Sequence, residues 1–245
     1  MGKRIIQQAR GKGSLTYRVR KKAFRFKIGY INEKGKARII KLIHSPGHSA
    51  PLIKIEINGK TFYNPAFKNA FEGQEIEMDN KVETGNITQL KNIPIGARVY
   101  NIESRFGDGG RMIRSAGSFA IVTKKLDGKV GLLMPSKKEI FVSENCRATI
   151  GEIAAGGRLE KPIIKAGKKY YMMKAKSKLW PRTSAVKMNV IDHPFGSGRG
   201  KNVGSKIIKR NAPPGKKVGL LKPRKTGRKR RAWLKQKNFY TEEKQ

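Results

Sequence analysis

Short apolar segments separated by turn-forming residues make up most of the middle of the chain. Their apolar residues alternate with polar ones or run continuously over about four to eight positions, which is typical of strands rather than helices. The segments are ARIIKLIH from Ala37, PLIKIEI from Pro51, KTFYN from Lys60, QEIEMD from Gln74, ARVYNIE from Ala97, SFAIVTKK from Ser118, KVGLLMP from Lys129, EIFVS from Glu139 and RATIGEI from Arg147. The pattern predicts an all-β central region.

Two of the connections carry strong hairpin signals. Asn58-Gly59 joins LIKIEI to KTFYN, and Asp127-Gly128 joins FAIVTKKL to KVGLLMP. Both dipeptides suit the positive φ values of a type I′ turn. Each hairpin lies in a different half of the strand-rich region, and Pro94 and Gly96 punctuate the sequence between the halves. We place a domain boundary near residue 85 and expect two small barrels.

A turn or two of helix around NPAFKNAF, from Asn64, is the only helical element that we expect. Aromatic residues cluster in and beside it, at Phe62, Tyr63, Phe67 and Phe71. Aromatic side chains bury large apolar areas, so we expect these four to pack in a core. Stacking on unpaired bases stays the alternative.

Charge is distributed unevenly along the 245 residues. The chain holds 56 Lys+Arg and 17 Asp+Glu, a formal net charge of +39. Residues 1–30 and 196–237 contain no acidic residue, and most of the β-branched and aromatic residues lie between them. The flanks have too little apolar content to offset the conformational entropy that ordering costs. We therefore expect the core in the middle and flanks that fold only against a partner.

A cationic excess of this size requires a polyanionic partner. Nucleic acid fits best, because each phosphate contact releases condensed counterions. An anionic membrane is the weaker alternative, since no apolar run reaches about 18 residues and no long amphipathic helix is visible. The N-terminal MGKRIIQQARGKGSL lacks the apolar core of a signal peptide. We expect a cytoplasmic protein with no membrane partner.

Cysteine and histidine are scarce. Cys146 has no second cysteine to pair with, and His44, His48 and His193 lack the spacing of a zinc site. His44 and His48 would face one metal only on a helix, which Pro46-Gly47 interrupts. The sequence predicts no metal site built from protein ligands, and a loop or RNA-facing role for His44 and His48.

The stretch MNVIDHPFGSGRGKN, from Met188, places Asp192 beside His193 and invites comparison with a catalytic dyad that has Ser197 as its nucleophile. Adjacent residues in a flexible loop seldom face each other, and triads assemble from distant parts of a fold. Carboxylates are too scarce in this third of the chain for metal-assisted phosphodiester cleavage. We predict that the protein is not an enzyme.

The glycine-rich and basic stretches are more typical of segments that contact phosphate than of catalytic or metal-binding loops. GSGRG, residues 196–200, lets backbone N–H groups approach phosphate but lacks the strand, helix and lysine-serine ending of a nucleotide-binding loop. FGDGG, residues 106–110, offers one carboxylate and is predicted as a turn, not a calcium loop. The basic run of residues 222–237 fits an arginine-rich segment ordered on RNA, with a solvated tail or a nuclear-localisation-like patch as the alternative.

Five motifs, in one order, resemble a single family. They are GKRIIQQARGKGS from Gly2, FGDGGRMIRSAGSFAIV from Phe106, CRATIGEIAAGGRLEKPIIKAG from Cys146, MNVIDHPFGSGRG from Met188 and RNAPPGKKVG from Arg210. Over nearly its full length the chain resembles the universal ribosomal protein L-two family of the large subunit, in its archaeal/eukaryotic form. One glycine-rich motif would carry little weight, but the five together are highly specific.

The resemblance implies an all-β fold with an OB-like barrel followed by an SH3-like barrel. The expected parts are a basic N-terminal extension at 1–33, an OB-like RNA-binding barrel at 34–85, an SH3-like barrel at 86–175 and a basic C-terminal extension at 176–245. The implied role is structural: binding of large-subunit rRNA and support for subunit assembly, subunit association and the peptidyl-transferase centre region during translation. The implied partners are that rRNA, neighbouring ribosomal proteins and the small subunit at the interface, and no homo-oligomer is expected.

The resemblance also implies which residues bind rRNA. His193 looks like the family's histidine in the loop near the peptidyl-transferase centre, and Gly196 and Gly198 match the family's glycines. No cofactor and no catalytic residue are expected, while hydrated Mg²⁺ that bridges acidic side chains or carbonyls to RNA stays open. The expected rRNA-binding residues are Lys3, Arg4, Arg10, Lys12, Arg18, Arg20, Arg111, Arg114, Arg147, Arg182, Met188, Asn189, Asp192, His193, Pro194, Gly196, Gly198, Arg199, Arg210, Lys216, Lys217, Arg224, Arg228, Arg230 and Arg231.

The chain departs from the family's pattern at two places. Ser184-Ala185 stands where the family usually has arginine-glycine before methionine-asparagine, and Lys187 follows unexpectedly. Ser197 replaces a glycine of the loop. Two rival functions stay open, namely His193 as a general base in peptidyl transfer, and a chromatin or DNA-packaging protein, which would prefer duplex DNA to folded rRNA.

Overall fold

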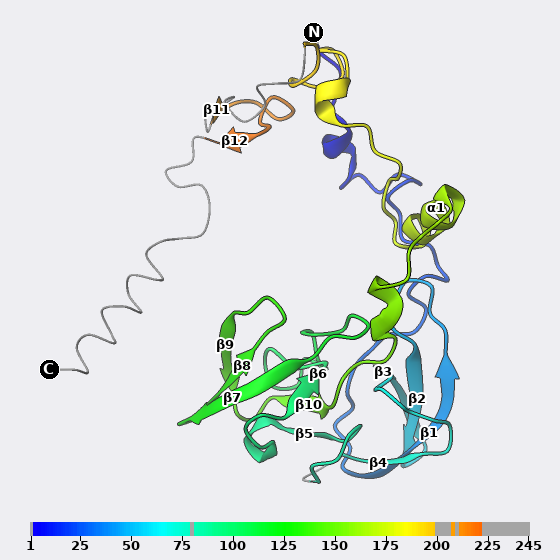
Figure 1. Ribbon diagram of the computed structural model, residues 1–245, viewed down its shortest axis with the longest axis vertical. Helices are drawn as coiled ribbons and strands as arrows, with labels where there is room; N and C mark the ends of the chain where they lie inside the picture. The colour runs from blue at the N-terminus through cyan, green and yellow to red at the C-terminus, as the bar shows by residue number, and fades with distance from the viewer. Residues whose placement is uncertain (1, 79–80, 199–206, 209–210, 222–245) are drawn as a thin grey trace, which may run out of the picture. The chain divides into compact units, whose positions relative to one another are not determined.

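The computed structural model describes residues 2–78, 81–198, 207–208 and 211–221 (Figure 1). The chain divides into two compact units, Met1–Arg18 with Pro181–Gln245, and Val19–Trp180. Every strand that the hydrophobic pattern predicts lies in the second unit. The two barrels and their cores are therefore features of that unit.

A four-stranded antiparallel sheet, which is the OB-like part, comes first along the chain. Its strands are β1 (Gly35–Ile43), β2 (Leu52–Ile57), β3 (Lys60–Pro65) and β4 (Glu75–Met78), in the spatial order β3-β2-β1-β4. The register of β1 against β2 shifts between Ile39 and Lys41. Such a bulge bends a strand and increases its twist, which helps a small sheet to curl around its core.

A six-stranded sheet follows and forms the SH3-like part. Its strands are β5 (Ile87–Gln89), β6 (Arg98–Tyr100), β7 (Ala120–Leu126), β8 (Lys129–Leu133), β9 (Glu139–Ser143) and β10 (Arg147–Ile150), in the order β5-β10-β6-β7-β8-β9. A second register shift lies in β7, between Val122 and Lys124. Both ladders are antiparallel throughout.

The prediction of an all-β middle is confirmed, because each predicted segment contains a strand. Both predicted hairpins are confirmed as well, with Ile57 paired to Lys60 and Leu126 paired to Lys129. Asn58 and Gly59 have φ values of 49° and 75°, as a type I′ turn requires, while in the second hairpin it is Gly128 that has a positive φ, of 71°. Strand β5 was missed because three residues are too few to show an alternation.

The remaining described elements are short. They are the 3₁₀ turns η1 (Ile6–Ala9), η2 (Leu90–Asn92), η3 (Gly156–Leu159) and η4 (Ala185–Lys187), the helix α1 (Ala166–Ala175), and the parallel strand pair β11 (Ile207–Ile208) and β12 (Leu220–Leu221). The predicted helix at NPAFKNAF is wrong, because Phe67 pairs with Ile153 in a β-bridge and Asn69 has a φ of 66°. Helix α1 was not predicted. It has no buried residue, and its sequence therefore lacks the apolar stripe by which an amphipathic helix is recognised.

The four aromatic residues near β3 have different surroundings. Phe62 and Phe67 are buried in the core of the first sheet, which confirms the packing that we predicted for them. Tyr63 is half-buried, and its ring lies 5.0 Å from that of Phe26. Phe71 is 60% exposed, so the prediction of core packing was wrong there.

Two hydrophobic clusters form the cores of the two barrels. The first, around Ile39, Ile53 and Ile55, also takes in residues of the second sheet such as Tyr100, and the second is built on Val122 and other residues of the six-stranded sheet. Ile113 packs against both clusters. It does so with a φ of 55°, which a β-branched residue seldom adopts, so packing on both sides holds it there.

A buried polar network joins the two sheets. The Asn64 amide donates to Thr149 Oγ1 at 2.9 Å, and the Asn101 amide donates to Asn64 Oδ1 at 2.8 Å. The Tyr30 hydroxyl donates to the carbonyl oxygen of Asn101 at 2.7 Å and lies 2.7 Å from Thr149 Oγ1. Among the described residues every buried side-chain nitrogen or oxygen has a partner. A satisfied network of this kind fixes the register of one sheet against the other.

A buried ion pair holds three separate segments together. The Glu103 side chain is fully buried and accepts hydrogen bonds from the Arg147 Nη2, at 2.8 Å, and from the Arg147 backbone, at 2.9 Å. Gly109 donates its backbone N–H to the same carboxylate at 3.2 Å. The Arg147 Nη1 donates to the carbonyl oxygen of Ile31 at 2.7 Å. The pair thus ties β10, the loop before Gly110 and the segment that precedes β1.

Replacing Glu103→Gln should strongly destabilise the second unit. The change leaves the Arg147 charge, whose side chain is 13% exposed, without its counterion. Breaking one side of a buried pair costs about 3–5 kcal/mol. The free energy of unfolding of the full chain in urea, followed by β-sheet circular dichroism, measures the loss.

Glu152→Gln is the matched control, because Glu152 pairs at 3.0 Å with the exposed Arg98. Exposed pairs contribute about 0–1 kcal/mol. Equal losses of unfolding free energy in the two variants would contradict a special role for Glu103.

Candidate nucleic-acid interface

The N-terminal residues and the loop around His193 lie together in the first compact unit. The backbone N–H of Lys3 donates to the carbonyl oxygen of Ile191 at 2.8 Å, and Lys3 Nζ lies 3.6 Å from Asp192 Oδ1. In the 3₁₀ turn η1 the Gln8 side chain accepts from the N–H of Ile5 at 2.9 Å. Two parts of the expected rRNA-binding set, distant in sequence, are thus brought into contact.

Residues 188–197 form a closed loop. The Ser197 N–H donates to the carbonyl oxygen of Met188 at 3.0 Å, and the N–H groups of Asp192 and His193 donate to that of Asn189 at 3.0 and 3.2 Å. A Cβ added to Gly196 would lie 2.2 Å from the Asn189 oxygen, so only glycine fits there. Ser197 itself has a φ of 57°, which accounts for the glycine that the family usually has at this position.

The His193 ring has one nitrogen committed inside this loop. The Phe195 backbone N–H donates to His193 Nδ1 at 3.0 Å. A backbone N–H can only donate, so Nδ1 is an acceptor and the neutral ring carries its proton on Nε2. Asp192, in turn, lies within ion-pair distance of Lys3. Asp192 and His193 thus contact different groups, Lys3 and the Phe195 backbone.

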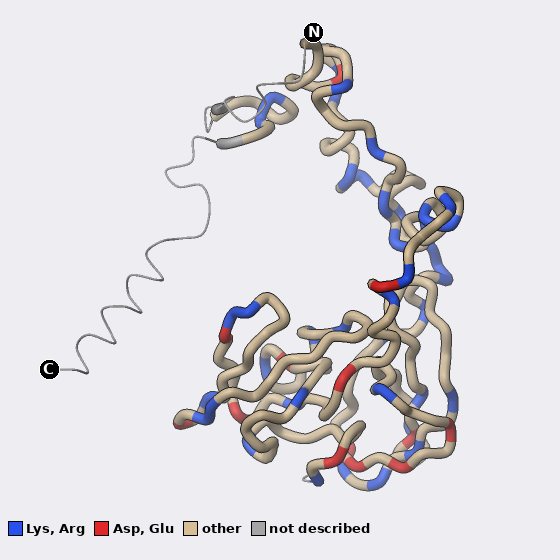
Figure 2. The backbone as a smooth tube through the Cα atoms, in the orientation of Figure 1, with Lys and Arg blue, Asp and Glu red and all other residues tan. Residues whose placement is uncertain are grey.

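The cations of the first unit are exposed and face little negative charge. Asp192 is the only acidic residue among the described residues of this unit. Figure 2 marks Lys and Arg positions along the same stretches. The exposed cations that the structure describes here are Lys3, Arg4, Arg10, Lys12, Arg18, Arg182, Lys187, Lys216 and Lys217. The Asp192 carboxylate, which lies beside Lys3, can balance only a small part of this charge.

Two of the arginines expected to bind rRNA are hydrogen-bonded within the second unit. Arg147 forms an ion pair with Glu103 and donates a hydrogen bond to the carbonyl oxygen of Ile31, as described above. Arg114 Nε donates to Asn101 Oδ1 at 3.0 Å, and its Nη2 donates to the carbonyl oxygens of Ile28 and Gly110. Burial lowers the pKa of the Arg114 guanidinium, and it raises the pKa of the Tyr30 hydroxyl, which therefore stays protonated and donates to Asn101.

The other expected residues are divided between exposed positions and positions outside the described residues. Arg20 and Arg111 are exposed in the second unit. Pro194 lies half-buried in the closed loop, and Gly198, directly after this loop, is exposed and has a φ of 113°. Outside the described residues lie Arg199, Arg210, Arg224, Arg228, Arg230 and Arg231, together with the basic run of residues 222–237.

The FGDGG segment is a turn, as predicted. Asp108 accepts hydrogen bonds from the backbone N–H groups of Ser104, Arg105 and Gly110 at 3.0, 3.2 and 3.0 Å. Burial by itself raises the pKa of Asp108, but the hydrogen bonds from Ser104, Gly110 and Arg105 outweigh it and lower the pKa overall. The turn presents Phe106, which is 64% exposed and which the sequence reasoning missed. An aromatic residue directly before a glycine turn was the available signal.

The described residues contain no group of three or more His, Cys, Asp or Glu side chains that could hold a metal ion. His48 Nδ1 lies 2.7 Å from the Ser45 hydroxyl, and its ring packs edge-on against Phe24. Burial raises the pKa of the Cys146 thiol, which keeps it protonated and unreactive. In the part of the chain that the structure describes, no helix is long and apolar enough to cross a membrane.

Replacing Gly196→Ala should open the closed loop, because its Cβ would collide with the backbone of Asn189. Overpacking of this kind costs roughly 1–3 kcal/mol. Amide hydrogen exchange over residues 188–198 of the full chain should accelerate about 5- to 150-fold. Gly11→Ala is the control, since a Cβ there meets nothing within 4 Å. Unchanged exchange in Gly196→Ala would contradict the close packing of this loop.

Comparison with known proteins bears on the whole chain. A family model described as the C-terminal domain of ribosomal proteins L2 matches residues 83–214, more than half of the sequence. The matched region includes the second sheet, helix α1 and the closed loop of residues 188–197.

Three relatives are similar over almost their full lengths. The large ribosomal subunit protein uL2 of Archaeoglobus fulgidus is 44% identical over 239 residues, 94% of this chain and 100% of the relative. Those of Hyperthermus butylicus and Saccharolobus islandicus are each 43% identical, over 240 and 236 residues, and the matches cover 94% of this chain and 100% and 99% of the relatives. These similarities confirm the resemblance that the five motifs indicated, and the chain belongs to the uL2 family of large ribosomal subunit proteins.

Proposed function

We propose that the chain, a structural component of the large ribosomal subunit in the cytoplasm, binds large-subunit rRNA through the exposed cations of its first unit. It is not an enzyme, in line with its family. The proposal is carried by one observation: the described cations of residues 2–18 and 181–217 are exposed, and the described part of this unit holds a single carboxylate to balance them. Phosphates supply the missing negative charge.

In this proposal the two barrels form the rigid body that docks on the rRNA. Several of their acidic residues are paired within the fold, as in Glu103 with Arg147, Glu152 with Arg98 and Glu139 with Lys124. We also propose that the chain has four parts, with boundaries after residues 33, 85 and 175. The loop that carries His193 is proposed to lie beside the peptidyl-transferase centre and the subunit interface. Contacts with neighbouring ribosomal proteins follow from a position in the subunit.

His193 has a structural role in this proposal, and the reason is chemical. A general base needs a free lone pair, and the lone pair of the neutral ring lies on Nδ1, which accepts the Phe195 N–H. Nε2 then points away from that bond as a donor. Such a donor suits a phosphate oxygen or a base acceptor, and not the abstraction of a proton.

Removing charge from Arg4, Arg10 and Lys12 should weaken rRNA binding and flatten its dependence on salt. Each lost phosphate contact lowers the slope of log affinity against log salt by about 0.7, so Arg4→Gln, Arg10→Gln and Lys12→Gln together lower it by about 2. Filter binding of the full chain to transcribed large-subunit rRNA over a range of salt concentrations measures the slope.

The matched control keeps the charge, with Arg4→Lys, Arg10→Lys and Lys12→Arg. Its slope should equal that of the unchanged chain, because counterion release depends on charge rather than on side-chain shape. If the uncharged triple variant keeps the full slope, or if the chain prefers duplex DNA to rRNA at equal salt, the proposed function fails.

Subunits that carry His193→Ala should form peptide bonds at an undiminished single-turnover rate per assembled particle. The substitution removes the hydrogen bond to Phe195 and so loosens the loop, which affects assembly rather than chemistry. His193→Asn is the control, because the asparagine side-chain oxygen can accept the hydrogen bond from the backbone N–H of Phe195. It should restore assembly. A loss of about 10²–10⁴ in single-turnover rate with both variants would support general-base catalysis instead.

A further inference from the structure

Strand β9 forms one edge of the six-stranded sheet, and among the described residues it pairs only with β8 (Figure 1). Where the two strands meet, the N–H of Met134 donates to the carbonyl oxygen of Lys138 at 2.9 Å. Hydrogen-bonded and non-hydrogen-bonded pairs alternate along an antiparallel ladder, so Glu139 and Phe141 direct their N–H and C=O groups away from β8. These backbone groups are placed to pair with a further strand.

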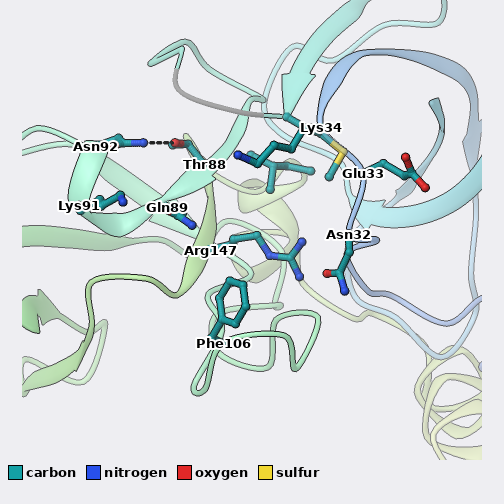
Figure 3. Close-up of a pocket in the computed structure, with 11 residues that line it drawn as sticks. Asn32, Glu33, Lys34, Thr88, Gln89, Lys91, Asn92, Phe106 and Arg147 are labelled. Atoms are coloured by element: carbon teal, nitrogen blue, oxygen red, sulfur yellow. Dashed lines mark hydrogen bonds between the residues drawn. The ribbon is translucent and has the colours of Figure 1, made fainter. Parts of the chain in front are cut away.

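The opposite edge of the same sheet, at β5, faces other parts of the second unit. Gln89 of β5 lines a cavity of about 400 Å³ together with Met78 of β4 and Arg147 of β10 (Figure 3). The guanidinium carbon of Arg147 lies 5.4 Å from the centre of the Tyr30 ring and 5.9 Å from that of the Phe106 ring. Of the two edges, β9 is therefore the one that a strand from outside can reach.

Exposed apolar side chains lie beside the β9 edge. Leu126, Leu133 and Phe141, which we call the β9 face, are 52%, 37% and 44% exposed. They occupy or pair with positions 129, 131 and 133 of β8, which alternate along the strand and so share one side of the sheet. The other side carries Val130 and Leu132 of the buried core. An accessible strand edge with exposed apolar side chains is a template for pairing with another chain.

Positive charge surrounds the β9 face. Lys129, Lys137 and Lys138 are exposed, and no described carboxylate forms an ion pair with them. Glu139, the acidic residue of β9, is already paired with Lys124 at 3.4 Å. A partner that carries carboxylates therefore finds complementary charge at this edge.

The composition and contacts of this region favour a polypeptide partner over RNA. Residues 119–146 contain five lysines but no arginine, the residue that best combines stacking with bidentate phosphate contacts. The Lys124 ammonium lies 5.1 Å from the centre of the Phe141 ring and covers a face on which a base would stack. The outward carbonyl oxygens of Glu139 and Phe141 need regularly spaced donors, which a β-strand supplies and a phosphate backbone lacks.

We infer that the β9 edge and the β9 face bind an extended, acidic segment of a neighbouring protein of the large subunit, which adds a strand to the sheet. The inference rests on the proposed function, because it needs a place in the subunit beside other proteins. The added strand pairs with the backbone of Glu139 and Phe141, and its alternate side chains pack on the β9 face. Its carboxylates lie beside Lys137 and Lys138.

Carbodiimide crosslinking of intact large subunits, followed by mass spectrometry, tests the nature of the partner. The reagent joins a lysine amine directly to a carboxylate, so Lys129, Lys137 or Lys138 should be joined to an aspartate or glutamate of another subunit protein. Such a crosslink supports the inference. It is overturned if these lysines give no crosslink to a protein, or if ultraviolet light instead joins residues 137–143 to RNA.

Amide hydrogen exchange tests the added strand itself. Exchange at Glu139 should be about 2- to 13-fold slower in the assembled subunit than in the free chain, as expected for one hydrogen bond gained. The double variant Leu133→Ser and Phe141→Ser should lose both the slower exchange and the crosslink. Phe71→Ser is the matched control, since Phe71 is 60% exposed in the same unit and lies outside the β9 face. It should keep both.

The same variants separate this inference from the proposed function. The serine substitutions remove no charge, so the salt dependence of rRNA binding should stay unchanged. Leu133→Ser alone replaces the double variant if circular dichroism shows that the latter has lost its β-structure. A crosslink and slowed exchange that persist in the folded variant contradict strand addition and leave rRNA binding intact. Loss of salt-dependent rRNA binding in the unchanged chain would instead indicate that the proposed function is wrong.

Discussion

The carboxylate of Glu103 is the point on which the larger unit depends. It is fully buried, and an unpaired carboxylate in that position would be far too costly, so Arg147 must stay beside it. Arg147 in turn holds the carbonyl oxygen of Ile31, and Glu103 holds the N–H of Gly109. One ion pair therefore sets the path of the chain into β1, the position of β10 and the base of the loop that carries Phe106.

The neutral part of the same interface has a related purpose. Asn64, Asn101, Thr149 and Tyr30 join β3 of one sheet to β10 of the other through hydrogen bonds that are all satisfied. Such a network adds little net stability but penalises any other register, because a slipped strand would leave several polar groups buried without partners. The two small barrels thus form one stiff body that can present a shaped surface to RNA.

Charge is organised in the opposite way in the two units. In the second unit several acidic residues form ion pairs within the fold, whereas the described part of the first unit holds many exposed cations and one carboxylate, that of Asp192. A ribosomal protein of the uL2 family needs both arrangements. Paired charge allows a barrel to fold, and unpaired charge gives a segment affinity for phosphate.

Sequence alone determined the longer strands, both hairpins, the cationic flanks and the family, because each rests on a local pattern: alternation, an Asn-Gly or Asp-Gly pair, charge counts and short motifs. Tertiary structure alone decided which groups Arg114 and Arg147 contact. In the sequence Arg147 is one more basic residue, and its contacts with Glu103, 44 residues away, and with Ile31, 116 residues away, exist only in the folded chain. A side chain's partner depends on long-range packing, which no local pattern encodes.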